Sequence, residues 1–397
     1  MKKEFGLYIH IPFCRQKCFY CDFPSFAGRE KKIDKYLQAL EQEFALLRQR
    51  LYQKDNVRDT ESKFAPRTIY IGGGTPSVLT VSQLQKLTSA IWEYCRYVNN
   101  GVGEEGGIRE FTVECNPEDV STDFVAQLRA MGVNRISMGV QTFDDKKLHF
   151  LNRRHSSLTA QKAIEVILNS GIKNVSIDLM YGFPNQTIKE WEEDIRLVRC
   201  FPIKHLSAYM LHYEEGTAMW RMLQQNKISE LEDSVCSQMY YLLKERLEEM
   251  GFQQYEISNF SKKHYVSKHN SSYWEGTPYI GIGAAAHSYN KDCRQWNVED
   301  LISYIEALRN KKLACETEWL SEKDRYNEMV MLRLRTMSGL NMQKLTSELG
   351  EAYSAYCIQQ AQKYINSNDL ELKDGVLYLS KKALFISDMV IRDLFML

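Results

Sequence analysis

The first half of this chain alternates short apolar runs, rich in strand-forming residues, with longer amphipathic segments. The runs are FGLYIHI, RTIYIGG, EFTVEC, NRISMGV, NVSIDLMYG and HLSAYML. Between the first two, apolar residues recur three and four positions apart from Ile33 to Leu51, which predicts a helix. About six β–α units in succession place their strands in one parallel sheet. The sequence therefore predicts an α/β fold, with the sheet either open or closed into a barrel.

The pattern changes from about residue 230. We expect a helix over 231–250, then an irregular stretch rich in aromatics, glycine and histidine over 251–296. Beyond about 312, helices precede LELKDGVLYLS, in which Asp374-Gly375 predicts a hairpin. The expected division is a barrel at 1–230, a barrel extension at 231–311, and a small C-terminal α+β domain, winged-helix-like, at 312–397.

Three local features are also expected from the turn and cap residues. Ser82 is expected to cap the helix after the second run, and Gly132 to end the helix after the third. The glycine-rich segment 98–107 is expected to be a flexible connecting loop.

The charge balance limits the functions open to the chain. Its 397 residues contain 51 Lys+Arg and 51 Asp+Glu. Winged-helix modules often bind DNA, but a chain without a positive excess is poorly suited to neutralise phosphates. No apolar run approaches the roughly 20 residues that span a bilayer, and the first residues make a poor secretory signal. We therefore expect a cytoplasmic protein with no membrane span and no nucleic-acid partner.

Three of the ten cysteines, Cys14, Cys18 and Cys21, form the pattern C-x3-C-x2-C. Zinc normally needs four ligands, and only His10 is near enough to be the fourth. Three thiolates suit an iron–sulfur cubane that keeps one iron open, so this interpretation is favoured over zinc or chance. The other cysteines are expected to be buried small hydrophobic residues: Cys95, Cys115, Cys200, Cys236, Cys293, Cys315 and Cys357.

Distinctive residues follow the expected strands. The cysteines follow the first strand, Gly72 to Pro76 follow the second, and Glu114, Gln141 and Asp178 lie at the ends of the next three. The carboxyl ends of parallel strands meet at one edge, where reacting groups gather. We expect these residues to face one mouth.

At this level of detail the chain resembles a known family. YIHIPFCRQKCFYC resembles the radical S-adenosylmethionine (SAM) superfamily. IYIGGGTPS, FTVECNPED, RISMGVQTFDDKKLHFLNRRH and SIDLMYGFPNQT resemble its coproporphyrinogen III oxidase-like branch, and most of all the heme-chaperone (HemW) group of that branch. The resemblance implies a partial (β/α)6 radical SAM barrel, with a 4Fe–4S cluster on Cys14, Cys18 and Cys21 and SAM on the open iron.

The same resemblance implies which residues lie near SAM. Glycines in the second strand's loop let the backbone approach a ligand closely. Arg153 is implied as a contact, although its neighbour Arg154 is an alternative. The full implied set is Tyr8, Tyr20, Gly73, Gly74, Thr75, Glu114, Gln141, Arg153 and Asp178.

A second motif, His269-Asn270-Ser271-Ser272-Tyr273-Trp274, resembles the H-N-x-x-Y-W motif of the heme-chaperone group. The resemblance implies heme binding by His269, Asn270, Tyr273 and Trp274. An imidazole is an axial ligand type, and aromatic rings offer flat apolar faces. His264 and His287 are alternative ligands. GIGAAAHS (281–288) matches a dinucleotide fingerprint poorly, because no βαβ unit follows, and is expected to be a close-packed turn.

The oxidase signature continues as C-x3-C-x2-C-x-C, but here its last position is Phe23. The oxidase also has an extension before its cysteines. The resemblance therefore favours a heme chaperone, which would use heme, a heme acceptor such as a membrane-associated respiratory protein, and a reductant such as flavodoxin or ferredoxin. A radical enzyme acting on a tetrapyrrole, by oxidative decarboxylation of coproporphyrinogen III, is the alternative, so enzymatic activity stays open. A redox-sensing nucleic-acid binder is disfavoured by the balanced charge.

Overall fold

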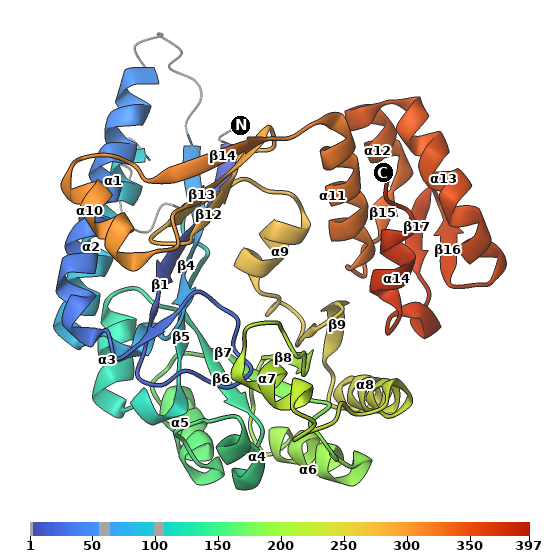
Figure 1. The fold of residues 1–397 in the computed structure, drawn as a ribbon, viewed down its shortest axis with the longest axis horizontal. Coiled ribbons are helices and arrows are strands. Elements are labelled where there is room, and N and C mark those ends of the chain that lie inside the picture. Colours follow the sequence, from blue (N-terminus) through green and yellow to red (C-terminus); the bar gives the residue numbers. More distant parts are fainter. Residues whose placement is uncertain (1–2, 55–63, 99–106) are drawn as a thin grey trace.

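The structure is a computed structural model that describes residues 3–54, 64–98 and 107–397 (Figure 1). Almost all of the loop expected at 98–107 lies outside the described residues. The six predicted strands form the parallel centre of a 12-stranded sheet, in the order β1-β4-β5-β6-β7-β8. They are β1 (Lys3–Ile11), β4 (Phe64–Gly73), β5 (Glu110–Cys115), β6 (Arg135–Gln141), β7 (Asn174–Tyr181) and β8 (His205–Met210).

Helices follow the strands and pack their apolar stripes against the sheet. Leu7, Ile9, Ile69 and Ile71 in the first two strands are fully buried, which explains their nearly continuous apolar runs. The predicted α/β fold, a partial (β/α)6 barrel, is confirmed (Figure 1). The helices are α1 (Ile33–Lys54), α2 (Val81–Val98), α3 (Thr122–Ala130), α4 (Asp145–Phe150), α5 (Ser157–Asn169), α6 (Ile188–Val198) and α7 (Ala218–Gln224).

The stretch expected to be irregular instead extends the sheet at both edges. Beyond β8 lie β10 (Asn259–Ser261) and β9 (Gln253–Glu256), and beyond β1 lie β11 (Tyr279–Ile282), β12 (His287–Tyr289) and β13 (Cys293–Asn297). The outermost strand, β14 (Cys315–Trp319), also joins this sheet, although its residues were expected to belong to the C-terminal domain. These strands are three to five residues long and mix polar with apolar residues, so they lack a clear period-two pattern. The helices of this part are α8 (Asp233–Glu249), α9 (Lys268–Trp274) and α10 (Leu301–Arg309).

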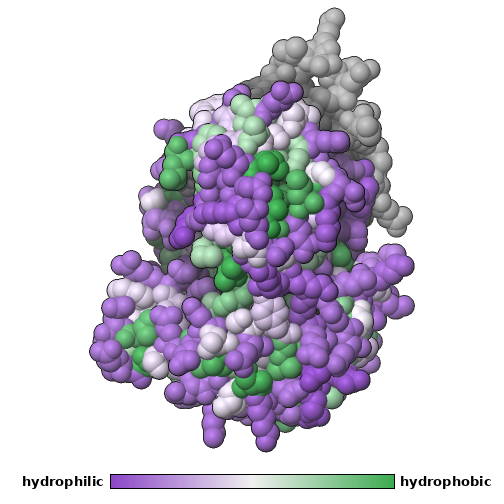
Figure 2. Space-filling view, turned by 90° about the vertical axis from the view of Figure 1, so that its right-hand side faces the viewer, coloured by the Kyte–Doolittle hydropathy of each residue, from purple (hydrophilic) through white to green (hydrophobic). Residues whose placement is uncertain are grey.

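The C-terminal helices and strands enclose a core of their own, which includes Tyr326, Val330, Leu345 and Leu377. Asp374 and Gly375 both have positive φ, 50° and 74°, and join β16 to β17 as the predicted tight hairpin. Figure 2 shows the side of the molecule on which this domain lies as mostly hydrophilic, with separate hydrophobic patches. The elements are α11 (Glu322–Leu334), β15 (Leu340–Asn341), α12 (Met342–Leu349), α13 (Glu351–Asn366), β16 (Leu370–Lys373), β17 (Val376–Leu379) and α14 (Ser387–Arg392).

One of the two predicted helix ends is wrong. Thr80, not Ser82, caps α2: its hydroxyl accepts from the N–H of Gln83, whose side chain accepts from the N–H of Thr80. Gly132, with φ of 94°, follows the last turn of α3 as expected.

The prediction for the scattered cysteines holds only in part. Cys95, Cys115, Cys236 and Cys357 are buried, as expected. The other three are not: Cys293 on β13 and Cys315 on the edge strand β14 are half-buried, and Cys200 is exposed just beyond the end of α6.

No helix within residues 3–54, 64–98 and 107–397 combines the length and the apolar character needed to cross a bilayer.

The buried carboxylate of Glu43 ties α1 to the barrel extension. It accepts hydrogen bonds from Gly283 N at 2.8 Å, Asn297 Nδ2 at 2.6 Å and the Tyr304 hydroxyl at 2.5 Å. A Cβ at Gly283 would lie 2.4 Å from the Tyr36 hydroxyl oxygen, and φ there is 110°. Segment 281–288 therefore contains the expected close-packed turn, at residues 283–286 between β11 and β12.

Glu43→Ala should lower the free energy of unfolding by roughly 3 kcal/mol, because it leaves three donors without their acceptor. The urea midpoint, followed by circular dichroism, measures this. Glu41→Ala, on an exposed position of the same helix, is the matched control. Equal midpoints for the two variants would show that the Glu43 contacts contribute little.

Candidate functional site

The three cysteines lie on a loop that leaves the carboxyl end of β1. Its ends are joined by β2 (Phe13–Cys14) and β3 (Phe26–Ala27), two short parallel strands. Cys14 is buried, and Cys18 and Cys21 are half-buried. The loop therefore has a small hydrogen-bonded base and almost no regular structure between its ends.

Bonds to the barrel hold the rest of the loop. Asn152 Nδ2 donates to Lys17 O at 2.8 Å, and Phe19 N donates to Leu151 O at 3.1 Å. His10 Nε2 contacts Pro24 O at 2.9 Å, and its Nδ1 contacts the Tyr8 hydroxyl at 2.9 Å. Since both nitrogens of His10 are occupied, it positions the loop and is not free to be a fourth zinc ligand.

The three thiols are of the ligand type that iron–sulfur clusters use. Within the part of the chain that the structure describes, no three His, Cys, Asp or Glu side chains converge as ligands of one metal ion. Three cysteines of a cubane bind three different irons, so they need not meet at one point. A Cβ at Gly74 would lie 2.9 Å from Cys14 Sγ, so a glycine keeps that side of the thiol open. Burial raises the pKa values of Cys14 and Cys21, so metal binding must favour the thiolate.

A chain of polar contacts joins two of the cysteines. The Thr75 hydroxyl lies 3.4 Å from Cys14 Sγ and accepts from Asn116 Nδ2 at 3.3 Å. Arg153 Nη2 donates to Asn116 Oδ1 at 2.8 Å, and Arg153 Nη1 lies 3.5 Å from Cys18 Sγ. Asn116 was not among the predicted site residues, although its place directly after β5 was a signal for it.

Arg153, rather than its neighbour, faces the cysteines. Its Nη2 also donates to Gly139 O at 2.7 Å. Its buried Nε has no hydrogen-bond partner among the described residues, which leaves a donor at the mouth. Arg154 is exposed and lies 3.7 Å from Glu118 in an ion pair.

Glu114 lies beside the glycine loop that follows β4. Its carboxylate accepts from the Tyr70 hydroxyl at 2.6 Å and from Gly73 N at 3.0 Å. Burial raises the pKa of Glu114 to about 7 despite these bonds. A cationic ligand nearby would favour the ionised carboxylate.

Of the other predicted residues, Gln141 and Asp178 lie on neighbouring strands and Tyr20 lies in the cysteine loop. Gln141 ends β6 with φ of 68°, and a Cβ at Gly139 would lie 2.8 Å from its Nε2. Asp178 on β7 is paired in register with Gly139, and burial raises its pKa to about 6. Tyr20 lies in the cysteine loop, and burial raises its pKa.

The second motif forms α9, which is fixed to the barrel by Glu110. That carboxylate accepts from the N–H groups of Lys268 and His269, both at 2.9 Å. The His269 ring is buried: its Nδ1 contacts the Thr68 hydroxyl and its Nε2 contacts the Tyr273 hydroxyl, each at 2.8 Å. Burial lowers the pKa of His269 to about 3, so the ring is neutral. Neither ring nitrogen is free in this structure.

A cavity of about 530 Å³ adjoins both the cysteine loop and α9. In Figure 1, α9 lies between the barrel sheet and α11 of the C-terminal domain. The buried Trp274 Nε1 has no partner among the described residues. The volume and the apolar lining suit a small organic ligand. The lining residues are Tyr8, His10, Phe23, Pro24, Asn270, Tyr273, Trp274, Gly276, Tyr279, Ala285, His287, Tyr289, Arg294, Glu328 and Leu332.

Comparisons with known sequences show the family to which the chain belongs. The family model described as "Radical SAM superfamily" matches residues 8–198, and the "HemN C-terminal domain" model matches residues 320–386. A Bacillus subtilis protein named "Heme chaperone HemW" is 34% identical over 346 residues, which cover 87% of each chain. The chain belongs to the HemW family.

A second relative and a solved structure were also found. A Lactococcus lactis protein of the same name is 31% identical over 98% of this chain and 94% of its own. The solved structure of Escherichia coli coproporphyrinogen III oxidase (HemN), described as a radical SAM enzyme, has a TM-score of 0.81 at 20% identity. The match covers 99% of this chain and 90% of that one. This likeness shows the fold, and membership in the superfamily implies a 4Fe–4S cluster and SAM.

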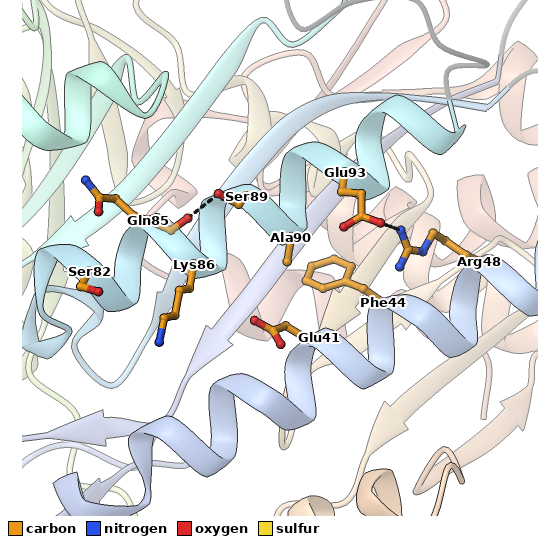
Figure 3. Close-up of a pocket in the computed structure, with 9 residues that line it drawn as sticks. All are labelled: Glu41, Phe44, Arg48, Ser82, Gln85, Lys86, Ser89, Ala90 and Glu93. Atoms are coloured by element: carbon orange, nitrogen blue, oxygen red, sulfur yellow. Dashed lines mark hydrogen bonds and ion pairs between the residues drawn. The ribbon is translucent and has the colours of Figure 1, made fainter.

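Two other cavities lie apart from the cysteines of this HemW-family chain. One, of about 460 Å³, lies between α1 and α2, where Phe44 and Ala90 line it and Arg48 pairs with Glu93 (Figure 3). The other, of about 570 Å³, contains His264 beside Arg67, Arg109 and Lys268. His264 is therefore separated from the cavity of about 530 Å³ beside α9, the aromatic cavity, whereas His287 lines that cavity.

Cys18→Ala should abolish cluster assembly, because it leaves one iron of the cubane without a protein ligand. Iron and inorganic sulfide content and the visible absorbance after anaerobic reconstitution measure this. Cys200→Ala, at an exposed position, should retain a full cluster. A Cys18→Ala protein with unchanged iron and sulfide would refute the assignment of this ligand.

Proposed function

We propose that this protein is a heme chaperone that binds heme in the aromatic cavity and passes it to an acceptor protein. The observation that carries the proposal is that this cavity borders the loop of Cys14, Cys18 and Cys21. Phe23 and Pro24, two and three residues after the last cysteine, line it together with Tyr273 and Trp274 of α9. The names of the relatives, which share most of their length with this chain, support the same function.

Heme chemistry matches the walls of the cavity. A porphyrin needs flat apolar surfaces, and Tyr273, Trp274, Tyr279 and Tyr289 supply aromatic rings. Arg294, which also lines the cavity and pairs with Glu328, carries the type of charge that binds a carboxylate. We propose that heme propionates contact this guanidinium.

The cysteine site would hold the cluster and SAM. When bound, the cluster supplies an open iron and a one-electron donor. Glu114 and the backbone at Gly73 and Gly74 would bind the polar groups of SAM. Arg153 and Asn116 would fix the site's shape beside Cys18. The remaining predicted contacts, Tyr8, Tyr20, Thr75, Gln141 and Asp178, stay part of this proposal.

The alternative is a radical enzyme that decarboxylates coproporphyrinogen III. Phe23 stands where the oxidase signature has a fourth cysteine, and its side chain is 61% exposed at the cavity. This difference favours the carrier. We also propose that the heme acceptor is a membrane-associated respiratory protein and that the reductant is a flavodoxin or ferredoxin. The proposed location is the cytoplasm.

Arg153→Met should weaken SAM binding to the reconstituted protein roughly tenfold or more, because it removes the bonds to Asn116 and Gly139. Equilibrium dialysis with labelled SAM measures the affinity. Arg154→Met is the matched control and should bind SAM almost as the wild type does. Equal losses in both variants would place Arg153 outside the SAM site.

Stoichiometric heme uptake without decarboxylation is expected of the chaperone. The reconstituted protein is titrated with heme by absorbance, and is separately given SAM, a reductant and coproporphyrinogen III. Product formation that disappears in Cys18→Ala would contradict the carrier and establish the enzyme. Absence of heme binding would also overturn the proposal.

A further inference from the structure

Strand β14 is the outermost strand at one end of the 12-stranded sheet (Figure 1). It is five residues long, and Glu316 to Trp319 are exposed. Strand β13 covers one side of its backbone, and among the described residues no strand covers the other side. An uncovered strand edge presents a row of unused hydrogen-bonding groups, which can pair with another chain.

The register of β14 shows which backbone groups are unused. Val298 N donates to Ala314 O and Leu320 N donates to Asp292 O, both at 2.9 Å, so the even-numbered residues of β14 bond to β13. In an antiparallel pair, the residues between them direct their backbone groups the opposite way. Within residues 3–54, 64–98 and 107–397, no hydrogen bond occupies the outward N–H and C=O groups of Cys315, Thr317 and Trp319.

The side chains of β14 place different chemistry on its two faces. Glu316 and Glu318 project from one face, because side chains alternate along a strand. No ion pair to either glutamate is present in the described part of the chain, and Arg294, opposite Glu318 on β13, pairs with Glu328 instead. Trp319 projects from the other face and is 75% exposed. The edge therefore offers two unpaired carboxylates on one face and an aromatic ring on the other.

The two carboxylates decide which kind of chain fits this edge. In the symmetric antiparallel pairing of two copies about Thr317, each Glu316 would lie opposite a Glu318. Like charges directly opposite one another destabilise a strand pair, so the edge is unsuited to a second copy of this chain. Lysine or arginine opposite each glutamate would instead be favourable, with an apolar residue opposite Trp319.

We propose that β14 is a docking edge that takes up an extended segment of a partner protein as a further strand of the sheet. The segment lies antiparallel to β14, as strands β11 to β14 lie to one another. Its basic residues face Glu316 and Glu318 and alternate with apolar residues, whose backbone bonds to the outward groups of β14. In strand addition the backbone bonds give affinity and the alternate side chains give specificity. The inference goes beyond the proposed function, because strand addition needs no heme.

The docking edge lies beside the aromatic cavity. Glu318 is paired with Arg294 on β13, which is paired with Tyr289 on β12. Paired residues project from the same face of a sheet, and Arg294 and Tyr289 both line the cavity. The face that carries the glutamates therefore continues the cavity wall. Since neighbouring strands are about 4.8 Å apart, an added strand would lie roughly 14 Å from β12, which brings the partner alongside the cavity.

The probe for this edge is a short labelled peptide in which lysine alternates with valine. Fluorescence anisotropy measures its binding to the full chain. A peptide with glutamate in place of lysine should bind at least roughly tenfold more weakly, because the acidic face repels it. Methylation of the valine N–H groups, which would bond to β14, should abolish binding. Methylation of the lysine N–H groups, which would point to solvent, should leave most of it.

Matched variants test the same contacts from the side of the protein. Thr317→Pro removes an outward N–H but no bond to β13, and proline is tolerated at such positions of edge strands. It should weaken lysine-peptide binding at least roughly tenfold, whereas Thr317→Val, which keeps the N–H, should not. Glu316→Lys/Glu318→Lys should reverse the preference, toward the glutamate peptide. Glu214→Lys/Glu215→Lys, at exposed positions after β8, is the charge-matched control and should keep the preference for lysine.

Unchanged binding in Thr317→Pro, or binding of the N-methylvaline peptide, would overturn strand addition. No binding of the lysine peptide by the wild type would overturn the docking edge altogether. A wild-type dimer in analytical ultracentrifugation that Thr317→Pro dissociates would assign the edge to a second copy instead. Circular dichroism checks that each variant is folded. Thr317→Pro should take up heme as the wild type does, so a failure of the proposed function is distinguishable from a loss of peptide binding.

Discussion

The arrangement of the site depends on fixing a loop that has almost no regular structure of its own. Such a loop places three thiols reproducibly only if its backbone is bonded to something rigid. Here the partners come from successive carboxyl ends of the parallel strands and the segments after them. His10 bonds to Pro24, Gly74 N donates to Ile11 O at 2.9 Å, and Asn152 donates to Lys17 O. Parallel pairing brings these distant segments to one edge, so the barrel itself is what makes the cysteine site possible.

The sequence was sufficient where the signal is local. The six strands, the long helices and the hairpin at Asp374-Gly375 each follow from periodicity or from a residue suited to positive φ. It failed where two local signals competed. Thr80 and Ser82 are both good helix caps, and the side chain of Gln83 decides between them by bonding back to the N–H of Thr80.

Long-range contacts could not be derived in this way. The aromatic cavity joins side chains from Tyr8 to Leu332, on strands, two helices and the cysteine loop. Its wall strands are short, and their pairing depends on the register of neighbours already in place. The hydrogen bonds of Asn116 could not be predicted either, because the partners of its amide, Arg153 and Thr75, are distant in the sequence. The positions of the strand ends predicted which part of the fold holds the site, but they did not predict the hydrogen bonds between its side chains.

The motif on α9 combines two physical roles that the sequence could not separate. A buried histidine must satisfy two polar nitrogens, and His269 does so with Thr68 on the barrel and Tyr273 on its own helix. Its ring also stacks on Tyr70, whose hydroxyl bonds to Glu114. One histidine therefore connects the wall of the aromatic cavity to a carboxylate at the mouth near the cysteines. His269 and Tyr70 thus form a continuous chain of contacts between Tyr273 in the cavity and Glu114 at the mouth.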